Sequence, residues 1–162
     1  MIEVFGNLWT YPADIRVITT NGAVNSRGQA VMGRGCAADA RIRYPGADIL
    51  LGAKIVQLGN KVHILKDPEP PDNTWLVTFP VKRHWKDMAD KALIVSSCVQ
   101  LLDTVAELEA KEDRDLLEVV MPRPGCGFGG LKWDMVKVIL DHWLDDRFRV
   151  ITWSSSGRPG VG

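Results

Sequence analysis

The chain has 162 residues, of which 46% are hydrophobic and 25% are charged, values typical of one globular domain with no segment that must be disordered. Basic and acidic residues both number 20, so the formal net charge is zero. This balance excludes the broad positive field of a general nucleic-acid-binding protein, and any contact with nucleic acid must be local.

Strands and helices alternate along the predicted chain. β-branched residues at 15–20 indicate a buried strand that ends at the turn pair Asn21-Gly22. Apolar residues at three- and four-residue spacing between 87 and 111 indicate a long amphipathic helix. The complete prediction has a first strand from residue 1 or 2, further strands at 15–20, 62–65, 75–79, 117–121 and 148–153, and helices at 36–44, 87–111 and 133–144. This alternation predicts an α/β sandwich around a mostly parallel or mixed sheet.

Two glycine-rich loops each follow a predicted strand. The first contains Met32-Gly33-Arg34-Gly35-Cys36-Ala37-Ala38, and the second contains Gly125-Cys126-Gly127-Phe128-Gly129-Gly130. Glycines let the backbone approach a ligand closely, and α/β sheets bind ligands where the strands end. Neither loop has Walker A spacing, and neither fits the dinucleotide fingerprint well. Two such loops favour a phosphate-containing ligand held from both sides, while each alone also fits a tight strand-to-helix connection.

Four runs of the chain together carry a resemblance to a known family. They are Gly6-Asn7-Leu8-Trp9, Thr20-Asn21-Gly22 with Met32-Gly33-Arg34-Gly35, Phe79-Pro80-Val81-Lys82-Arg83-His84-Trp85, and the run from Pro122 to Trp133. Over nearly its whole length the chain resembles macrodomains, most of all the branch that contains the DarG antitoxin macrodomain and the terminal ADP-ribose glycohydrolase of animals. The resemblance implies a three-layer α/β/α macrodomain with a central mixed sheet at residues 1–155. The small, polar, Pro- and Gly-containing end of the chain predicts a flexible tail at 156–162.

The resemblance also implies a binding site for ADP-ribose. The residues assigned to it are Asn7, Leu8, Asn21, Gly33, Arg34, Gly35, Cys36, Gly125, Cys126, Gly127, Phe128, Gly129, Gly130 and Trp153. Asn7, Leu8 and Trp153 would contact adenine, Asn21 the distal ribose, and the glycine-rich loops the diphosphate. Simpler roles remain open: Asn7 can form a turn, Asn21 can cap a loop and Trp153 can belong to the core. Cys126 is interpreted as a packing residue and not as a nucleophile.

Lys82 aligns with a lysine that macrodomain relatives use catalytically, so the resemblance implies that its amine acts at the anomeric carbon of the distal ribose. Burial and the charges of Arg83 and His84 are expected to lower the pKa of this amine. Asn21 and His84 are further catalytic candidates, although a histidine at the surface is more common than one that transfers protons. Gly129 stands where the animal glycohydrolase has an aspartate, which favours the DarG-like branch.

The implied function is removal of ADP-ribose from a modified acceptor, with a nucleobase of DNA as the first acceptor and a protein acidic side chain as the second. The basic and aromatic cluster from Lys82 to Lys86 offers single-stranded DNA a surface for stacking and charge contacts. The alternatives are a phosphatase for ADP-ribose 1″-phosphate and a non-enzymatic module that recognises ADP-ribose or sequesters a nucleotide. No cofactor and no metal are expected. Residues 22–32 form an extra stretch near the expected distal ribose, so the sequence does not fix the acceptor.

The cysteines and the hydropathy pattern suggest a cellular location. Cys36, Cys98 and Cys126 lack the C-x-x-C spacing of a zinc site or redox pair, which is typical of buried thiols in a reducing compartment. The first strand begins too early to leave room for a secretory signal, and no apolar run approaches the length of about 18 residues that a membrane span needs. A cytoplasmic monomer without membrane contact is therefore expected.

Overall fold

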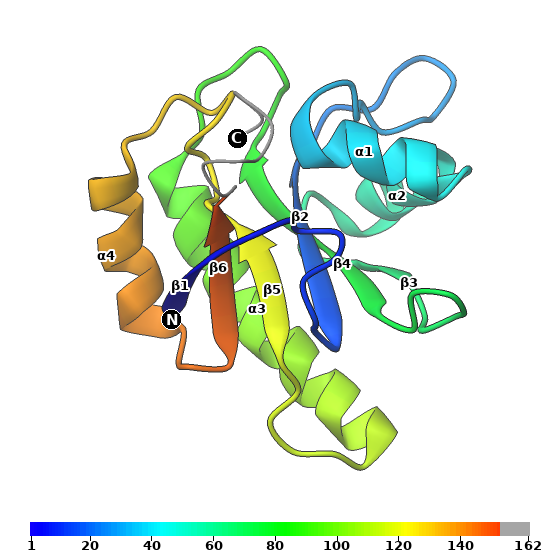
Figure 1. Ribbon diagram of the computed structural model, residues 1–162. Coiled ribbons are helices and arrows are strands. Elements are labelled where there is room, and N and C mark those ends of the chain that lie inside the picture. The colour runs from blue at the N-terminus through cyan, green and yellow to red at the C-terminus, as the bar shows by residue number, and fades with distance from the viewer. Residues whose placement is uncertain (153–162) are drawn as a thin grey trace.

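A computed structural model describes residues 1–152 of the chain (Figure 1). The strands are β1 (Ile2–Phe5), β2 (Ile15–Asn21), β3 (Ile64–Lys66), β4 (Trp75–Lys82), β5 (Val119–Pro122) and β6 (Phe148–Thr152). The helices are α1 (Gly35–Arg43), α2 (Ala47–Leu58), α3 (Lys91–Glu112) and α4 (Trp133–Trp143). Every predicted strand and helix is present, with bounds shifted by a few residues.

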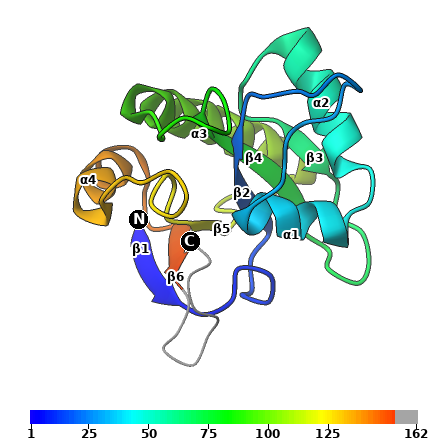
Figure 2. The same cartoon turned by 90° about the horizontal axis from the view of Figure 1, so that it is seen from above.

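The described strands form one sheet in the order β1-β6-β5-β2-β4-β3. β3 is antiparallel to β4 and the other neighbouring pairs are parallel, so the sheet is mixed. Figure 2 shows α3 and α4 on one face of the sheet and α1 and α2 on the other. One group of buried apolar side chains packs the sheet against α3 and α4, and a second group packs it against α1 and α2. These layers confirm the predicted three-layer α/β/α fold.

β4 is longer than predicted and carries the chain as far as Lys82. The predicted strand ends at Phe79, and the next residue is a proline, which lacks the N–H that a ladder needs. In the structure Pro80 pairs only with β2, since the register between β3 and β4 covers Leu76 and Val77. Within the described sheet, Pro80 therefore lies on a stretch of β4 that has an open edge, where proline is tolerated. Lys82 is therefore the last residue of β4.

The helix α2 is absent from the predicted elements. The pair Pro45-Gly46 does end α1, as predicted, but Gly46 with φ of 94° also begins a second helix directly afterwards. The outer side of α2 is apolar, with exposed side chains at Ile49, Leu50, Val56 and Leu58. Because apolar residues occur on both its inner and its outer side, the segment lacks the amphipathic period that identifies a surface helix.

Residues 22–32 adopt a defined turn that packs on α2. Val24 and Ala30 form an isolated antiparallel bridge, and the Ala30 N–H donates to a backbone carbonyl of α2 at 2.9 Å. A Cβ at Gly52 of α2 would lie 2.0 Å from the Gly28 carbonyl oxygen. Only glycine therefore allows the turn to approach the helix so closely, and the turn is held in place beside the end of β2.

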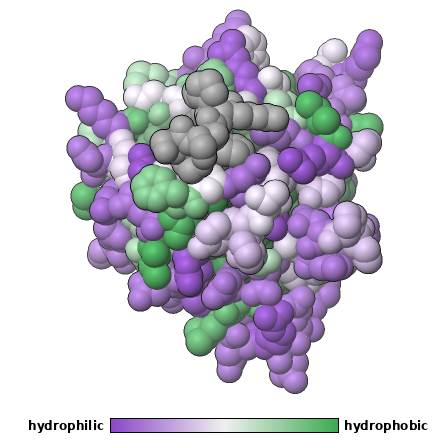
Figure 3. Space-filling view, viewed as in Figure 1, coloured by the Kyte–Doolittle hydropathy of each residue, from purple (hydrophilic) through white to green (hydrophobic). Residues whose placement is uncertain are grey.

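The surface shown in Figure 3 is mostly hydrophilic, and its hydrophobic residues lie in small separate areas. Of the helices within residues 1–152, none combines the length and the apolar character that crossing a lipid bilayer requires. In the same part of the chain, histidine, cysteine, aspartate and glutamate side chains form no group of three that could hold a metal ion.

Candidate functional site

Three loops meet at one edge of the sheet because β2, β4 and β5 are parallel neighbours that end on the same side. The loop after β2 carries the first glycine-rich segment, and the loop after β5 carries the second. The register makes Asn21, at the end of β2, the Cα partner of Lys82, at the end of β4. The topology therefore brings both glycine-rich segments and the lysine to one place.

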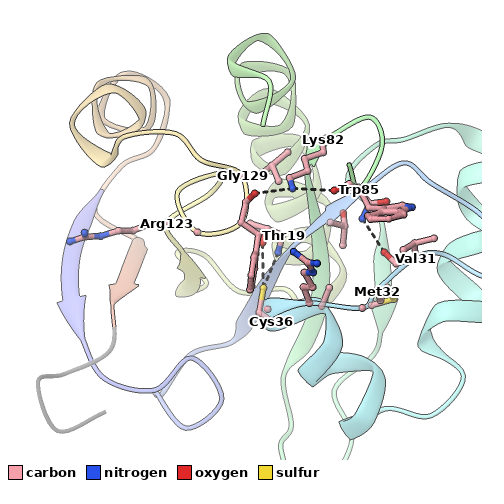
Figure 4. Close-up of a pocket in the computed structure, with 18 residues that line it drawn as sticks. Thr19, Val31, Met32, Cys36, Lys82, Trp85, Arg123 and Gly129 are labelled. Atoms are coloured by element: carbon pink, nitrogen blue, oxygen red, sulfur yellow. Dashed lines mark hydrogen bonds between the residues drawn. The ribbon is translucent and has the colours of Figure 1, made fainter. Parts of the chain in front are cut away.

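These loops enclose a cavity of about 310 Å³, called here the first hollow (Figure 4). Its wall includes the ends of β2 and β4 and both glycine-rich loops. A second hollow of about 280 Å³ lies beside it, between the segment after β1, α1, the loop after β5 and the end of β6. Cys36, Arg123 and Gly127 line both hollows, which therefore form one continuous cleft.

The Lys82 side chain enters the first hollow from the end of β4 and is half-buried. Its Nζ donates to the backbone carbonyl of Phe128 at 3.0 Å and to that of Trp85 at 3.4 Å. Figure 4 shows the amine between these two segments, with a dashed line to each. An ammonium group has three donors, so one remains for a ligand.

Positive charge gathers at the first hollow. The Arg34 guanidinium lies 5.3 Å from the centre of the Phe128 ring, so the two glycine-rich loops touch through these side chains. The Arg123 side chain points away from the cavity in Figure 4, and its Nη2 lies 3.3 Å from a carboxylate oxygen of Glu3. Among the described residues that line the first hollow, none has a carboxylate or an imidazole. Lys82 is thus the amine in this wall that can transfer a proton or attack a carbon atom.

Asn21 lines the first hollow and also closes the turn that follows β2. Its Oδ1 accepts from the Ala23 N–H at 2.9 Å, and its Nδ2 donates to the Val31 carbonyl at 3.0 Å. Both polar atoms therefore hold together the two ends of the turn at 22–32. The loop-capping role is observed, and the contact with a distal ribose stays a prediction.

The two thiols of the cleft are protonated at neutral pH. Burial raises the pKa of Cys36, an effect opposed by hydrogen bonds with Thr19, whose N and Oγ1 both lie 3.4 Å from the sulfur. Burial also raises the pKa of Cys126 to about 11, and the nearby charge of Arg123 opposes this rise. Because the thiolate is the nucleophilic form of cysteine, the environment gives neither sulfur a nucleophilic role.

The second glycine-rich loop is tightly packed. A Cβ at Gly129 would lie 2.5 Å from the Gly125 carbonyl oxygen and 2.8 Å from the Ala89 Cβ. The Ala89 N–H donates to the Gly129 carbonyl and the Leu131 N–H to the Gly125 carbonyl, both at 2.9 Å. Gly125 has φ of 75°, a left-handed conformation that disfavours side chains. No carboxylate can stand at position 129 without movement of the backbone.

The first glycine-rich loop is open by comparison. A Cβ at Gly33 would have no heavy atom within 4 Å. Arg34 is the extended N-cap residue of α1, and no side chain accepts a hydrogen bond from the first N–H groups of this helix. The helix starts at Gly35 with Cys36 beside the cavity, so these N–H groups are available to an anion.

The residues assigned to adenine are dispersed. Leu8 is buried and lines the second hollow. Asn7 lines neither hollow, and its Oδ1 accepts from a backbone N–H two residues later at 2.9 Å, as in a turn. Trp153 lies outside the described residues. The proposed contacts of Asn7 and Trp153 with adenine therefore stay predictions.

The two cations expected beside the Lys82 amine do not line the first hollow. Arg83 is exposed, and its Nε lies 3.5 Å from a carboxylate oxygen of Asp90. His84 is exposed and stacks on Trp85 with 5.5 Å between ring centres. A catalytic role for His84 stays a prediction.

Trp85 and Asp39 are among the cleft-lining residues that the sequence analysis did not assign to the ADP-ribose site. Trp85 lines the first hollow and remains 44% exposed. Asp39 lines the second hollow from α1. The signal for Asp39 was its place three residues after Cys36, because residues three apart share one face of a helix.

Comparison with known proteins finds similar sequences and similar folds. No family model matches the chain. A DNA ADP-ribosyl transferase-DNA ADP-ribosyl glycohydrolase fusion protein of Thermosipho africanus is 28% identical over 152 residues, which cover 80% of this chain and 36% of that protein. The chain spans between 30% and 36% of the length of the curated relatives that it matches.

Two solved structures resemble the fold over most of its length. The macrodomain of Mycobacterium tuberculosis DarG has a TM-score of 0.72 at 24% identity, with 96% of this chain and 99% of that chain covered. Thermosipho africanus DarTG in complex with ADP-ribose has a TM-score of 0.69 at 25% identity, with 96% of this chain and 42% of that chain covered. Together with the mixed sheet, these likenesses show that the chain has the macrodomain fold, and its sequence is similar to that of DarG-type proteins.

Proposed function

We propose that this chain binds ADP-ribose along the cleft and hydrolyses the glycosidic bond that joins ADP-ribose to an acceptor. The observation that carries the proposal is the Lys82 amine, which lies in the first hollow 3.0 Å from the Phe128 carbonyl. No other described residue in that wall has an amine, and none has a carboxylate or an imidazole. The fusion protein that resembles this chain is named as a DNA ADP-ribosyl glycohydrolase, which supports the same reaction.

The diphosphate is proposed to lie between the two glycine-rich loops. On one side are Gly33, Arg34, Gly35 and Cys36, and on the other is the segment 125–130. The uncapped start of α1 offers backbone N–H groups and the positive end of the helix dipole, and Arg34 adds a full charge. These groups suit a diphosphate better than a neutral ligand.

The two hollows would then hold the two ends of the ligand. The adenosine part lies in the second hollow with Leu8, and the distal ribose lies in the first hollow with Asn21 and Lys82. The contacts of Asn7 and Trp153 with adenine belong to the same proposal. In this orientation the anomeric carbon C1″ of the distal ribose comes next to the lysine.

The reaction breaks the bond between C1″ and the acceptor, and water supplies a hydroxyl group to C1″ and a proton to the acceptor. Lys82 can act in two ways. As an ammonium it protonates the departing acceptor, and as a neutral amine it attacks C1″ and is later displaced by water. Both roles require an amine that can give up a proton. A guanidinium group stays protonated at neutral pH, so arginine cannot replace the lysine.

The first acceptor that we propose is a nucleobase of DNA. The exposed Trp85 ring lines the first hollow, and the Lys86 Nζ lies 5.2 Å from the centre of that ring. An exposed aromatic ring beside a cation is a surface on which an unpaired base stacks while its phosphate is attracted. A single strand would thus leave the cavity along Trp85 and Lys86. A protein acidic side chain is the second acceptor to consider.

The proposal is tested by the release of free ADP-ribose from three substrates, measured by chromatography. The substrates are an ADP-ribosylated single-stranded DNA oligonucleotide, a protein ADP-ribosylated on acidic side chains, and ADP-ribose 1″-phosphate. We expect the fastest release from DNA. Release from the phosphate ester alone would establish the phosphatase alternative instead. Tight binding of ADP-ribose with no release from any substrate would establish the reader or sequestering module.

A further inference from the structure

The two ends of the cleft differ in the charged groups of their walls. The first hollow has the cations Lys82 and Arg34 in its wall. The second hollow has one described carboxylate in its wall, that of Asp39. Arg123 lines this hollow too, but its guanidinium is paired with Glu3 at 3.3 Å and lies over the Trp133 ring. A ligand with an anionic part and a neutral part therefore has a preferred direction in this cleft.

Asp39 belongs to the wall of the second hollow by its place on α1. The neighbouring residues Ala37 and Ala40 are buried in the core beneath the helix. Asp39 itself is half-buried and lines the cavity. Its charge contributes to the raised pKa of Cys36, which fits a carboxylate close to the sulfur where the two hollows join.

Within residues 1–152, the Asp39 carboxylate has no hydrogen bond and no ion pair. The other acidic residue of α1 and α2 differs: Asp48 of α2 accepts from the Ile49 N–H at 2.9 Å and lies outside both hollows. Asn7 offers no second acceptor, because it lines neither hollow and its Oδ1 already accepts a backbone N–H. Asp39 is thus the charged acceptor that the described wall presents to a ligand.

The chemistry of a carboxylate limits what can fill this hollow. An ionised carboxylate only accepts hydrogen bonds, and covering it without supplying a donor leaves a desolvated charge, which is costly. A phosphate group close to it adds repulsion between like charges. A neutral hydrogen-bond donor on the occupant would satisfy the Asp39 carboxylate, whereas a negative charge next to Asp39 would be repelled.

We propose that Asp39 accepts a hydrogen bond from the adenosine part of ADP-ribose, either from the adenine amino group or from a ribose hydroxyl, and excludes nucleotides that carry a phosphate there. This inference rests on the proposed function, since it takes ADP-ribose as the ligand. Asp39 is then the residue that fixes the direction of the ligand and selects against its 2′-phosphorylated form. The anionic diphosphate stays at Arg34 and the glycine-rich loops.

The test uses isothermal titration of the full chain with three ligands. ADP-ribose is the reference, ADP-ribose 2′-phosphate adds a charge, and inosine diphosphate ribose replaces the amino group with a carbonyl. The variants are Asp39→Asn, which keeps an acceptor oxygen, Asp39→Ala, which removes it, and Asp48→Asn as a control with the same change in charge. Thermal unfolding by circular dichroism checks that every variant folds.

We expect wild-type protein to bind ADP-ribose 2′-phosphate at least tenfold more weakly than ADP-ribose. Asp39→Ala should weaken binding of ADP-ribose by about ten- to a hundredfold, the range expected for one hydrogen bond to a charged group. Asp39→Asn should lose less affinity for ADP-ribose and much of the discrimination against the 2′-phosphate. Asp48→Asn should match wild type.

The inosine ligand distinguishes the two donors. If the amino group is the donor, wild type prefers ADP-ribose over inosine diphosphate ribose and Asp39→Ala removes that preference. If a ribose hydroxyl is the donor, Asp39→Ala weakens both ligands equally. A folded Asp39→Ala protein with unchanged affinity for ADP-ribose and unchanged discrimination overturns the inference alone. Failure of wild type to bind ADP-ribose overturns the proposed function, and the inference with it.

Discussion

The two glycine-rich loops look alike in sequence and differ in packing. A Cβ at Gly33 of the first loop would meet open space, whereas a Cβ at Gly129 of the second would lie 2.5 Å from a backbone oxygen. The first loop leads directly into α1, while two residues separate Gly130 from the start of α4. Glycine is therefore required by the fold at Gly129, whereas at Gly33, in the wall of the first hollow, packing leaves room for a side chain.

The largest effect that this difference predicts is on stability. Gly129→Ala forces a methyl group against the Gly125 carbonyl and the Ala89 side chain, and overpacking of this kind costs about 3 kcal/mol of unfolding free energy. Gly33→Ala is the matched control and should change the unfolding free energy by less than about 0.5 kcal/mol. Urea unfolding followed by circular dichroism measures both. Equal unfolding free energies of the two variants would show that Gly129 is not packed more tightly than Gly33.

The next effect is on binding. Gly33→Glu should fold like wild type, because its Cβ has room, but should weaken ADP-ribose binding by roughly a hundredfold since a carboxylate stands at the proposed diphosphate site. Gly33→Gln has the same size without the charge and separates bulk from repulsion. Isothermal titration measures the affinity. If Gly33→Glu binds as wild type does, the first loop does not hold the diphosphate.

A smaller effect is expected where the loops touch each other. Phe128→Ala removes the ring that lies 5.3 Å from the Arg34 guanidinium. Loss of an exposed cation–π contact is worth about 0.5–1 kcal/mol, so the affinity for ADP-ribose should fall by roughly two- to fivefold. Phe5→Ala, an exposed phenylalanine of β1 that lines neither hollow, is the control. An effect as large as that of Gly33→Glu would mean that Phe128 itself grips the ligand.

The smallest effect is predicted for the thiols, of which each loop contributes one. With a pKa of about 11, the Cys126 thiol stays protonated throughout the range between about pH 6 and pH 9, and thiolate would form only as the pH rises toward that value. Cys126→Ser should therefore keep kcat within about twofold of wild type across that range. A fall in kcat that grows with pH would show that a thiolate takes part.

The helices show how far the sequence predicts the fold. In α3, apolar residues follow the helical period and Asp90 caps the start by accepting from the Ala92 and Leu93 N–H groups. Both signals are local, and the helix was predictable from them. α2 carries exposed apolar residues on its outer side and a glycine in its interior, Gly52, whose purpose is contact with the distant turn at 22–32. Because this contact joins segments far apart in sequence, no local sequence pattern predicts it.

The residues of the site also differ in whether local sequence patterns reveal them. The glycine-rich loops and Lys82 were predictable because they form recognisable runs in the chain. The places of Asp39 and Trp85 in the cleft depend on which segments the sheet brings together, namely the ends of strands far apart in sequence. Asn7 shows the reverse, because its run resembles a binding motif while its side chain serves a turn in this structure.

The most direct test of the account is the activity of Lys82 variants on whichever substrate of the panel releases ADP-ribose. Lys82→Ala should lower kcat by roughly a thousandfold, as expected for loss of a group that transfers protons or attacks carbon, while the Kd for ADP-ribose rises by less than about tenfold. Lys82→Arg should lose nearly as much activity because arginine stays protonated. Full activity in Lys82→Arg would contradict the account, since Lys82 would then contribute only its charge.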